Sequence, residues 1–186
     1  MRQLTDFINK YTDLDPEAIN ALGDCVKPEE FSRNQFILEP GQYCNKLWFI
    51  KSGMIRKFHL NDGKEITSWI HCENEICTSL TSYFHKSPSF EYIQAYETTF
   101  TLSIDRQSSE KLSQFPQFSD FSTRLLTDQL GLIDLNSKQF SLMTAVEKYN
   151  FLKSIAPNMF KRARLRDIAS IMGITPETLS RIRRKG

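Results

Sequence analysis

The C-terminal stretch DIASIMGITPETLSRIRRKG, from Asp167 to Gly186, decides how this chain is organised. Apolar residues recur at helical spacing on both sides of Gly173, which predicts two short helices joined by a tight turn. Thr175 is a favourable helix cap, and Pro176 suits the first position of the second helix. Ala169 is small enough for the two helices to cross closely. The stretch therefore predicts a helix-turn-helix.

Basic residues are concentrated at this end of the chain. Residues 161–186 hold eight Lys and Arg against two acids, a net charge of +6. The remaining 160 residues hold sixteen basic and twenty acidic side chains, a net charge of −4. A basic end on an acidic body indicates a polyanionic partner for that end. A solvated surface helix is the alternative that charge alone leaves open.

The second helix of the motif is expected to present a polar face, with its N-terminus entering the major groove of double-stranded DNA. Arg181 can make a bidentate contact to guanine, and Glu177 can accept a hydrogen bond from a cytosine amino group. Thr175, Thr178 and Arg166 are better placed for phosphates, where they would position the protein rather than read sequence. The predicted DNA-binding residues are Arg166, Thr175, Pro176, Glu177, Thr178, Ser180, Arg181 and Arg184.

The middle of the chain has the pattern of strands. From about Phe31 onward, short runs rich in aromatic and branched residues are punctuated by glycines, and Asp62-Gly63 is a hairpin signal. In MIRKFHL, residues 54–60, Arg56 shares one face with Phe58, and Lys57 lies on the opposite face. Strands at this spacing predict a closed antiparallel sandwich or roll. Residues 73–88 lose the alternation and predict a short helix or loop between two strands.

Helices are predicted on both sides of the strands. The first 30 residues have a helical pattern, in which Ile19, Leu22 and Val26 follow a capping Asp15-Pro16. A long helix is expected over residues 113–140, with apolar residues on more than one side. Such a helix must pack on the roll and on something else, and a second chain would satisfy it through a parallel seam. Its apolar residues are Phe118, Phe121, Leu125, Leu126, Leu130, Leu132, Ile133 and Leu135.

A further helix is expected over residues 144–155. It would turn Val146, Tyr149 and Leu152 inward and end at Pro157. The predicted fold class is α+β, with an N-terminal antiparallel β-roll, a long dimerisation helix and a C-terminal helix-turn-helix domain. The expected boundaries are residues 1–112, 113–141 and 142–186.

Other features narrow the class of protein. No stretch is apolar enough to span a membrane, and the first residues lack a signal-peptide core, so a cytoplasmic location is expected. The four cysteines are expected to be free thiols there. Cys72 and Cys77 are spaced C-x4-C, which is not a zinc-ribbon pattern, and we predict no metal site. The three histidines show no H-x-H spacing, and no nucleophile arrangement is supported, so an enzyme is not expected.

Three blocks in this order resemble the Crp/Fnr family of bacterial transcription regulators. They are the aromatic roll with Gly41, Leu47-Trp48-Phe49-Ile50 and Gly53, a long helix, and GITPETLSRIRR, residues 173–184. The terminal block is similar to relatives from Bacteroidetes-type bacteria. The resemblance implies a cyclic-nucleotide-binding-type roll, a dimerising helix and a DNA-binding head that effector binding repositions. It also implies a homodimer, an inverted-repeat operator and RNA polymerase as a further partner.

The effector site departs from the pattern of family members that bind cyclic AMP. Those members hold the ribose and phosphate with a Gly-Glu pair and an Arg-Ser pair. Here Asn74-Glu75 stands where Gly-Glu would be, and Ser89 stands where the Arg would be. A buried cyclic phosphate would lack a compensating cation. We therefore expect that cyclic AMP is not bound in the family's manner, and we leave another small-molecule effector open. The residues assigned to the pocket are Glu75, Ile76, Ser89 and Phe90.

Two other functions remain as alternatives to a dimeric regulator. One is a sensor or adaptor that has a roll of this kind and acts through protein contacts. The other is a cupin-like metalloenzyme. The sequence does not identify an effector, an operator, or whether the protein activates or represses.

Overall fold

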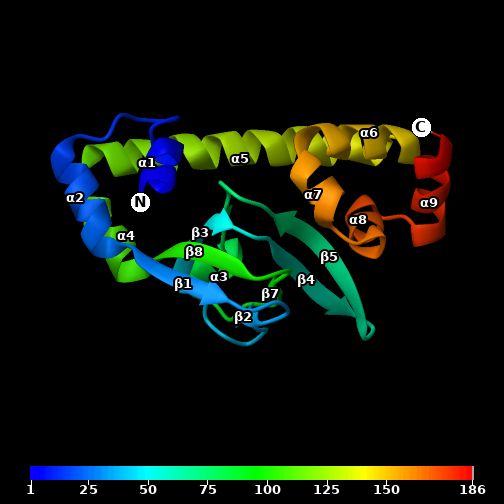
Figure 1. Cartoon of the computed structure of the whole chain (residues 1–186), viewed down its shortest axis with the longest axis horizontal. Coiled ribbons are helices and arrows are strands. Elements are labelled where there is room, and N and C mark those ends of the chain that lie inside the picture. The colour runs from blue at the N-terminus through cyan, green and yellow to red at the C-terminus, as the bar shows by residue number, and fades with distance from the viewer. Residues whose placement is uncertain (186) are drawn as a thin grey trace.

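The computed structural model describes residues 1–185, without the side chains of residues 132–139, 141 and 185. In this part of the chain, eight strands form two four-stranded sheets. The long helix α5 runs along one side of the roll, from the N-terminal helices at one end to the C-terminal helices at the other (Figure 1). The predicted α+β class with an antiparallel roll is confirmed. None of the helices described combines the length and the apolarity that a membrane span requires.

The two sheets have the strand orders β1-β8-β3-β6 and β2-β7-β4-β5, and all their pairings are antiparallel. Side chains from both sheets form a shared core that includes Trp48, Ile50, Ile55 and Ile93. The strand bounds are β1 Lys27–Phe31, β2 Phe36–Leu38, β3 Lys46–Ser52, β4 Ile55–Asn61, β5 Lys64–His71, β6 Ile76–Cys77, β7 Tyr92–Ala95 and β8 Thr99–Asp105.

The hairpin between β4 and β5 is the feature of the roll that later meets the C-terminal helices. It turns at Asp62-Gly63, as predicted, and both residues have positive φ, at 49° and 75°. Successive side chains of β4 point to opposite faces, so that Ile55 packs into the roll while Arg56 points out of it. A bulge between Lys57 and Phe58 interrupts the register with β5.

Gly53, between β3 and β4, lies close against Thr98 and Thr99 at the start of β8. Its φ is +95°, and a Cβ there would lie 2.7 Å from the Thr98 carbonyl oxygen and 2.6 Å from Thr99 Oγ1. Both the backbone conformation and the missing side chain are therefore required at this position. The turn brings the Gly53 carbonyl to the edge of the roll, where an arginine of the C-terminal helices reaches it.

The N-terminal helices are α1 (Arg2–Ile8) and α2 (Pro16–Cys25), followed by strand β1, so that the helical prediction for the first 30 residues extended too far. Asp15 caps α2 by accepting a hydrogen bond from the Ala18 N–H at 2.8 Å, as its sequence predicted. The buried face of α2 consists of Ala18 and Leu22. Ile19, which was expected to share that face, is 37% exposed because it lies one position away from the buried stripe.

Three further helices surround the roll: α3 (Leu80–His85) within the predicted insertion, α4 (Arg106–Leu112), and α5 (Pro116–Leu142), which has 27 residues. Phe118 and Phe121 of α5 are buried against the N-terminal helices. Leu126 and Leu130 are 38% and 65% exposed. The side chains of Leu132, Ile133 and Leu135, also assigned to the apolar faces of this helix, lie outside the described residues.

The C-terminal head, residues 144–185, consists of α6 (Ala145–Ile155), α7 (Pro157–Arg162), α8 (Leu165–Met172) and α9 (Pro176–Lys185). A capping box between Thr144 and Glu147 starts α6. One expectation was wrong here: Val146 is 53% exposed in the first turn of α6. The helix ends before Pro157, as predicted, and Pro157 also starts α7.

Candidate nucleic-acid interface

Helices α8 and α9 form the predicted helix-turn-helix. Gly173 ends α8 in the left-handed conformation, with φ at 66°, and the Ile174 N–H donates to the Ala169 carbonyl at 3.0 Å. Thr175 caps α9 by accepting a hydrogen bond from the Thr178 N–H at 3.2 Å. The glycine and the threonine thus perform the roles that the sequence assigned to them.

The two helices are held together by a fully buried apolar contact. Ile168, Ala169 and Leu179 are each 0% exposed, and Met172 is 1% exposed. Ala169 lies where close crossing requires a small side chain, as predicted. Ile174 is half-buried and packs against the same cluster. Because α9 is packed on α8 through this contact and joined to it by a three-residue turn, the two helices form one rigid unit.

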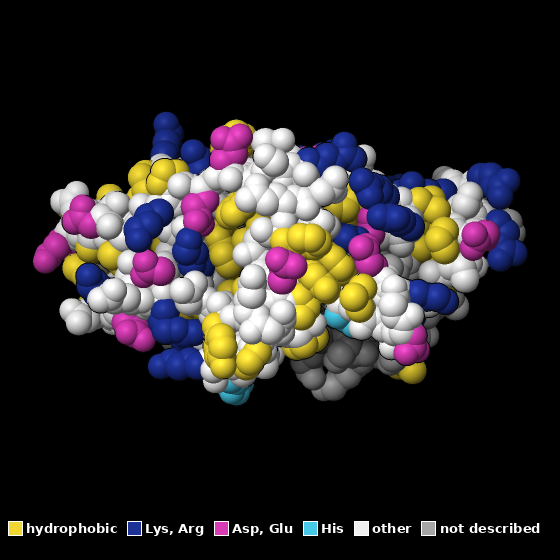
Figure 2. Space-filling model, turned by 90° about the horizontal axis from the view of Figure 1, so that it is seen from below, with side chains coloured by type: hydrophobic (Ala, Val, Ile, Leu, Met, Phe, Trp, Pro, Cys, Tyr) yellow, Lys and Arg dark blue, Asp and Glu magenta, His cyan; other side chains and the backbone are white. Residues whose placement is uncertain are grey.

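The outward face of α9 is basic and open. It borders a shallow groove of about 370 Å³, and the Lys and Arg side chains at this end of the molecule lie on the right of Figure 2. In the part of the chain that the structure describes, no carboxylate lies within ion-pair distance of Arg181 or Arg184. The groove is lined by Leu165, Pro176, Glu177, Ser180, Arg181 and Arg184.

The groove brings together five of the eight residues that the sequence assigned to DNA binding. Thr175 and Thr178 lie at the start of α9, where their hydroxyl groups are 3.1 Å apart. Arg166 lies on α8, with its side chain 60% exposed. Leu165 of α8, which the sequence analysis did not assign to DNA binding, also borders the groove.

Glu177 is charged within this basic surface. Its own backbone N–H, the Thr175 hydroxyl and the nearby Arg181 hold the pKa of the Glu177 carboxyl below its usual range. At neutral pH it is therefore an acceptor of hydrogen bonds and not a donor. An ionised carboxylate at the N-terminus of α9 can accept from a base amino group but would repel a phosphate.

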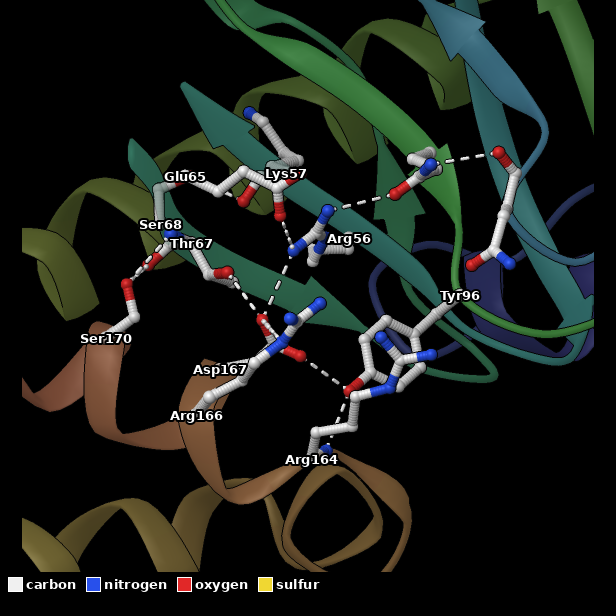
Figure 3. Close-up of polar contacts among 12 residues, drawn as sticks. Arg56, Lys57, Glu65, Thr67, Ser68, Tyr96, Arg164, Arg166, Asp167 and Ser170 are labelled. Atoms are coloured by element: carbon white, nitrogen blue, oxygen red, sulfur yellow. Dashed lines mark hydrogen bonds and ion pairs between the residues drawn. The ribbon is translucent and has the colours of Figure 1, made fainter. Parts of the chain in front are cut away.

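The inner side of the head is docked on the outer face of the roll. Figure 3 shows Asp167 of α8 at the centre of this contact. Its Oδ1 accepts hydrogen bonds from Arg56 Nη1 at 3.2 Å and from Thr67 Oγ1 at 3.0 Å. Its Oδ2 accepts from Tyr96 Oη at 2.7 Å. Tyr96 in turn accepts from the Arg164 N–H at 2.7 Å. We refer to this contact between head and roll as the junction.

A second group of contacts lies at the other edge of the junction. Arg162, at the end of α7, forms ion pairs with Glu73 at 2.8 Å and Glu97 at 3.3 Å, and donates to the Gly53 carbonyl at 3.1 Å. Apolar side chains of both parts share one cluster beside these contacts, including Met54 and Ile70 from the roll. The sequence reasoning had not assigned a role to any of these ion pairs.

The interior of the roll holds a different ion pair. Lys57 Nζ lies 3.1 Å from Glu91 Oε1 and donates to the Thr78 carbonyl at 2.9 Å. The two charged side chains are 14% and 10% exposed. The sequence reasoning missed Lys57 as a cation of the effector region, although strand alternation had already placed it on the face opposite Arg56.

The residues assigned to the effector pocket differ in their burial and contacts. Ser89 is buried, with its hydroxyl 3.2 Å from that of Ser79 and donating to the Glu91 carbonyl. Glu75 is paired with His71 at 3.0 Å, and its neighbour Ile76 packs against the N-terminal core. Phe90 is 63% exposed. The assignment of these four residues to one effector pocket stays a prediction.

The thiols are mostly inside the protein. Cys44, Cys72 and Cys77 are buried, and Cys25 is half-buried. Burial, with smaller contributions from nearby acids, raises the pKa of both Cys72 and Cys77 to about 12. These thiols are therefore protonated at neutral pH. The described residues contain no cluster of three or more His, Cys, Asp or Glu that could hold a metal ion.

The structure thus joins an antiparallel β-roll to a helix-turn-helix head. Residues 28–114 match the model of the cyclic nucleotide-binding domain family. The chain as a whole has the fold of the Crp/Fnr-type transcription regulators. The resemblance that the sequence suggested is confirmed at this level.

Solved structures of this type align over most of the chain. The catabolite activator protein of Thermus thermophilus is 20% identical, with a TM-score of 0.58, over 92% of this chain and 83% of that one. A CooA variant from Carboxydothermus hydrogenoformans is 20% identical, with a TM-score of 0.66, over 89% and 78%. The regulator CLP of Xanthomonas campestris, described as responsive to c-di-GMP, is 12% identical, with a TM-score of 0.67, over 92% and 91%. No curated protein matches the sequence.

Proposed function

We propose that this protein is a dimeric, sequence-specific DNA-binding transcription regulator that acts in the cytoplasm and is not an enzyme. The observation that carries the proposal is the outward face of α9. Among the described residues, Arg181 and Arg184 have no carboxylate within ion-pair distance, and they lie on a helix that the buried Leu179 contact holds on α8. Placed in the major groove, Arg181 would contact guanine and Glu177 a cytosine amino group.

The phosphate contacts in this proposal come from residues around the groove. Thr175 and Thr178 lie at the N-terminal end of α9, where backbone N–H groups and the helix dipole favour an anion. Arg166 is exposed on the neighbouring helix. These contacts would set the register of the head on the duplex, whereas the side chains further along α9 would read bases.

Dimerisation in this proposal uses α5. Leu126 and Leu130 lie four residues apart on this helix, and both are exposed in the single chain. Exposed leucines at this spacing form one apolar stripe, which a second copy of α5 would cover. Two heads related by a two-fold axis would read an inverted repeat with half-sites about 10 bp apart, or a multiple of that distance.

The roll in this proposal does not bind cyclic AMP in the usual way. Lys57 is a cation inside the roll, but it is already paired with Glu91, and Ser89 makes its hydrogen bonds within the protein. A cyclic phosphate would have to displace the Glu91 carboxylate and leave it buried without a partner. Another small-molecule effector, and contact with RNA polymerase, stay open.

The first experiment is the selection of bound sequences from a randomised pool of duplex DNA, with and without cyclic AMP. We expect enrichment of an inverted repeat in both conditions, with a steep loss of binding at higher salt. Enrichment only with cyclic AMP would overturn the proposal for the roll. Enrichment in neither condition would overturn the proposal of effector-independent DNA binding.

A further inference from the structure

We propose that Asp167 is a positioning residue for DNA recognition. It ties α8 to the outer face of the roll and thereby holds α9 in the orientation that presents its basic face to DNA. The inference rests on the proposed DNA-binding function. In this inference, Asp167 of the head and Arg56 of the roll together fix the angle between the two parts.

Asp167 is only 3% exposed, although it lies on the first helix of a basic head. A buried carboxylate is costly unless hydrogen bonds and a counter-charge compensate it. The close donors to this carboxylate, Arg56, Thr67 and Tyr96, all belong to the roll. On its own helix, Arg166 Nε is 4.0 Å away. The compensation is therefore available only while the head is docked.

Arg56 forms the same contact from the side of the roll. Its side chain is 5% exposed, it lies 4.0 Å from the centre of the Phe58 ring, and Gln94 accepts from its Nη2 at 3.0 Å. Its Nη1 is shared between Glu65 at 2.8 Å and Asp167 at 3.2 Å. The guanidinium is thus held by Glu65, Gln94 and Phe58 of the roll itself, and a fixed donor imposes direction on its acceptor.

The apolar contacts of the junction do not fix the angle between the head and the roll. Packing of Met54 and Ile70 against α8 removes apolar area from water, but this driving force has no preferred angle. Three hydrogen bonds that reach the two oxygens of one carboxylate from β4, from β5 and from the residue after β7 do have a preferred angle. The polar contacts therefore set the orientation, and the apolar contacts supply much of the affinity between head and roll.

Backbone contacts at both ends of α8 reinforce this orientation. At its start, the Arg164 N–H donates to Tyr96 Oη. Toward its end, Ser170 Oγ accepts from the Thr67 N–H at 2.9 Å. Asp167 lies between these two points, so that α8 is held along its length. Since α9 is packed rigidly on α8, fixing α8 also fixes α9.

The docked arrangement leaves the DNA-facing side of α9 open. Arg181 and Arg184 are exposed, and α9 lies at the end of the molecule opposite helices α1 and α2 (Figure 1). Docking therefore does not hide the recognition surface. Loss of the junction should allow the two heads of a dimer to reorient independently and should weaken binding to a two-half-site operator.

The test is Asp167→Asn, compared with Asp24→Asn as a matched control. Asp24 is an exposed acid on α2, and its substitution removes the same single negative charge. If only the loss of one negative charge mattered, both variants would bind DNA slightly more tightly than the wild type. The positioning role predicts instead that Asp167→Asn binds the selected operator about tenfold more weakly, within the usual range of coupling between sites. The salt dependence should keep its slope, because no phosphate contact is lost.

Hydrogen exchange at the Thr67 amide reports the junction independently of DNA. This N–H donates to Ser170 of the head, so it should exchange faster in Asp167→Asn and remain protected in Asp24→Asn. Titration of the fraction that binds DNA separates weaker binding from partial unfolding. If Asp167→Asn does not fold, Tyr96→Phe removes one hydrogen bond to the carboxylate and keeps the ring, and a smaller loss of about threefold is expected.

Operator affinity that is unchanged or increased in Asp167→Asn, relative to Asp24→Asn, overturns the inference. Arg181→Ala measured in parallel keeps the two proposals apart. If operator binding is lost in Arg181→Ala but not in Asp167→Asn, the DNA-binding proposal holds and the positioning role of Asp167 is overturned. If the wild-type protein selects no DNA at all, the proposed function fails. In that case, equal rates of hydrogen exchange at the Thr67 amide in the wild type and in Asp167→Asn would also overturn the role of Asp167 in docking the head on the roll.

Discussion

The roll and the head use their cations in opposite ways. Inside the roll, Lys57 is paired with Glu91. At the start of α4, Arg106 donates to the Tyr83 carbonyl and lies over the Tyr83 ring. On the outward face of the head, Arg181 and Arg184 have no carboxylate within ion-pair distance among the described residues. A phosphate that approaches the head displaces water, whereas one that enters the roll must displace a protein carboxylate. The difference favours the head as the place where this protein binds anions.

The inner and outer sides of the head show the same contrast on a smaller scale. Asp167 and Arg164 face the roll and are used in the junction. Glu177 and Arg181, on the next helix, face outward. One side of the pair α8 and α9 thus contacts the roll, and the other side is exposed and accessible to a partner.

The largest effect is expected for Glu91→Ala in the roll. The substitution would leave the Lys57 ammonium about nine-tenths buried without its counter-charge, which costs about 3–5 kcal/mol of unfolding free energy for a buried pair. Urea unfolding followed by circular dichroism measures this cost. The matched control is Asp6→Ala, which breaks the exposed Arg2–Asp6 pair, with side chains 96% and 67% exposed, and should cost less than about 1 kcal/mol.

Replacement of both roll residues sharpens this prediction. In Lys57→Met combined with Glu91→Met, neither charge is left alone, and most of the stability should return. A cost for Glu91→Ala as small as that of the surface control would mean that water already compensates Lys57. The roll would then be open to an anionic effector, and the contrast with the head would not hold.

The next effect is expected for Arg181→Ala on the outward face of α9. Loss of a bidentate contact to guanine should weaken operator binding by about 1–3 kcal/mol, roughly fivefold to 150-fold. Preference for guanine at one position of each half-site should relax at the same time, which repeated selection from the DNA pool would show. Arg2→Ala removes an exposed positive charge at the other end of the molecule and serves as the control. Unchanged base preference in Arg181→Ala would show that this side chain contacts only phosphate.

The helix-turn-helix was predictable from sequence because its determinants are local. Gly173 at the turn and Thr175 at the cap act within a few residues, and the apolar spacing of Ile168 and Leu179 is visible without any distant partner. Strand alternation in residues 54–60 likewise separated Arg56 from Lys57. It could not show which face of β4 points into the roll, and for that reason the interior cation was missed.

The junction could not be predicted, because its partners are far apart in the chain. Arg56 and Asp167 are separated by 111 positions, and Tyr96 and Asp167 by 71. No local pattern connects them, and an acid in a basic segment is more often a solvated surface residue. Pro157 shows another limit of local reading. Proline suits the first turn of a helix and disrupts helix interiors, so it marks a boundary without stating on which side the helix lies.

The smallest effect concerns Tyr96 in the junction. Burial, and next its hydrogen bond to Asp167, raise the pKa of the Tyr96 hydroxyl from 10.0 to about 12, against the opposing effect of the Arg164 N–H. A raised pKa means that the folded protein holds this proton more tightly than the unfolded chain does. The stability that this group contributes is therefore complete below about pH 10 and is lost as the pH rises toward about 12.

Ultraviolet titration of the tyrosines measures this difference, with Tyr96→Phe subtracted from the wild type. We expect one hydroxyl that titrates near pH 12, well after an exposed tyrosine. In Asp167→Asn the same difference should shift to lower pH, because the carboxylate that opposes ionisation is gone. A difference curve centred near pH 10 in the wild type would mean that the head leaves the roll in solution. The outward and inward sides of the head would then be equally exposed, and the orientation of α9 would be set by DNA instead of by the roll.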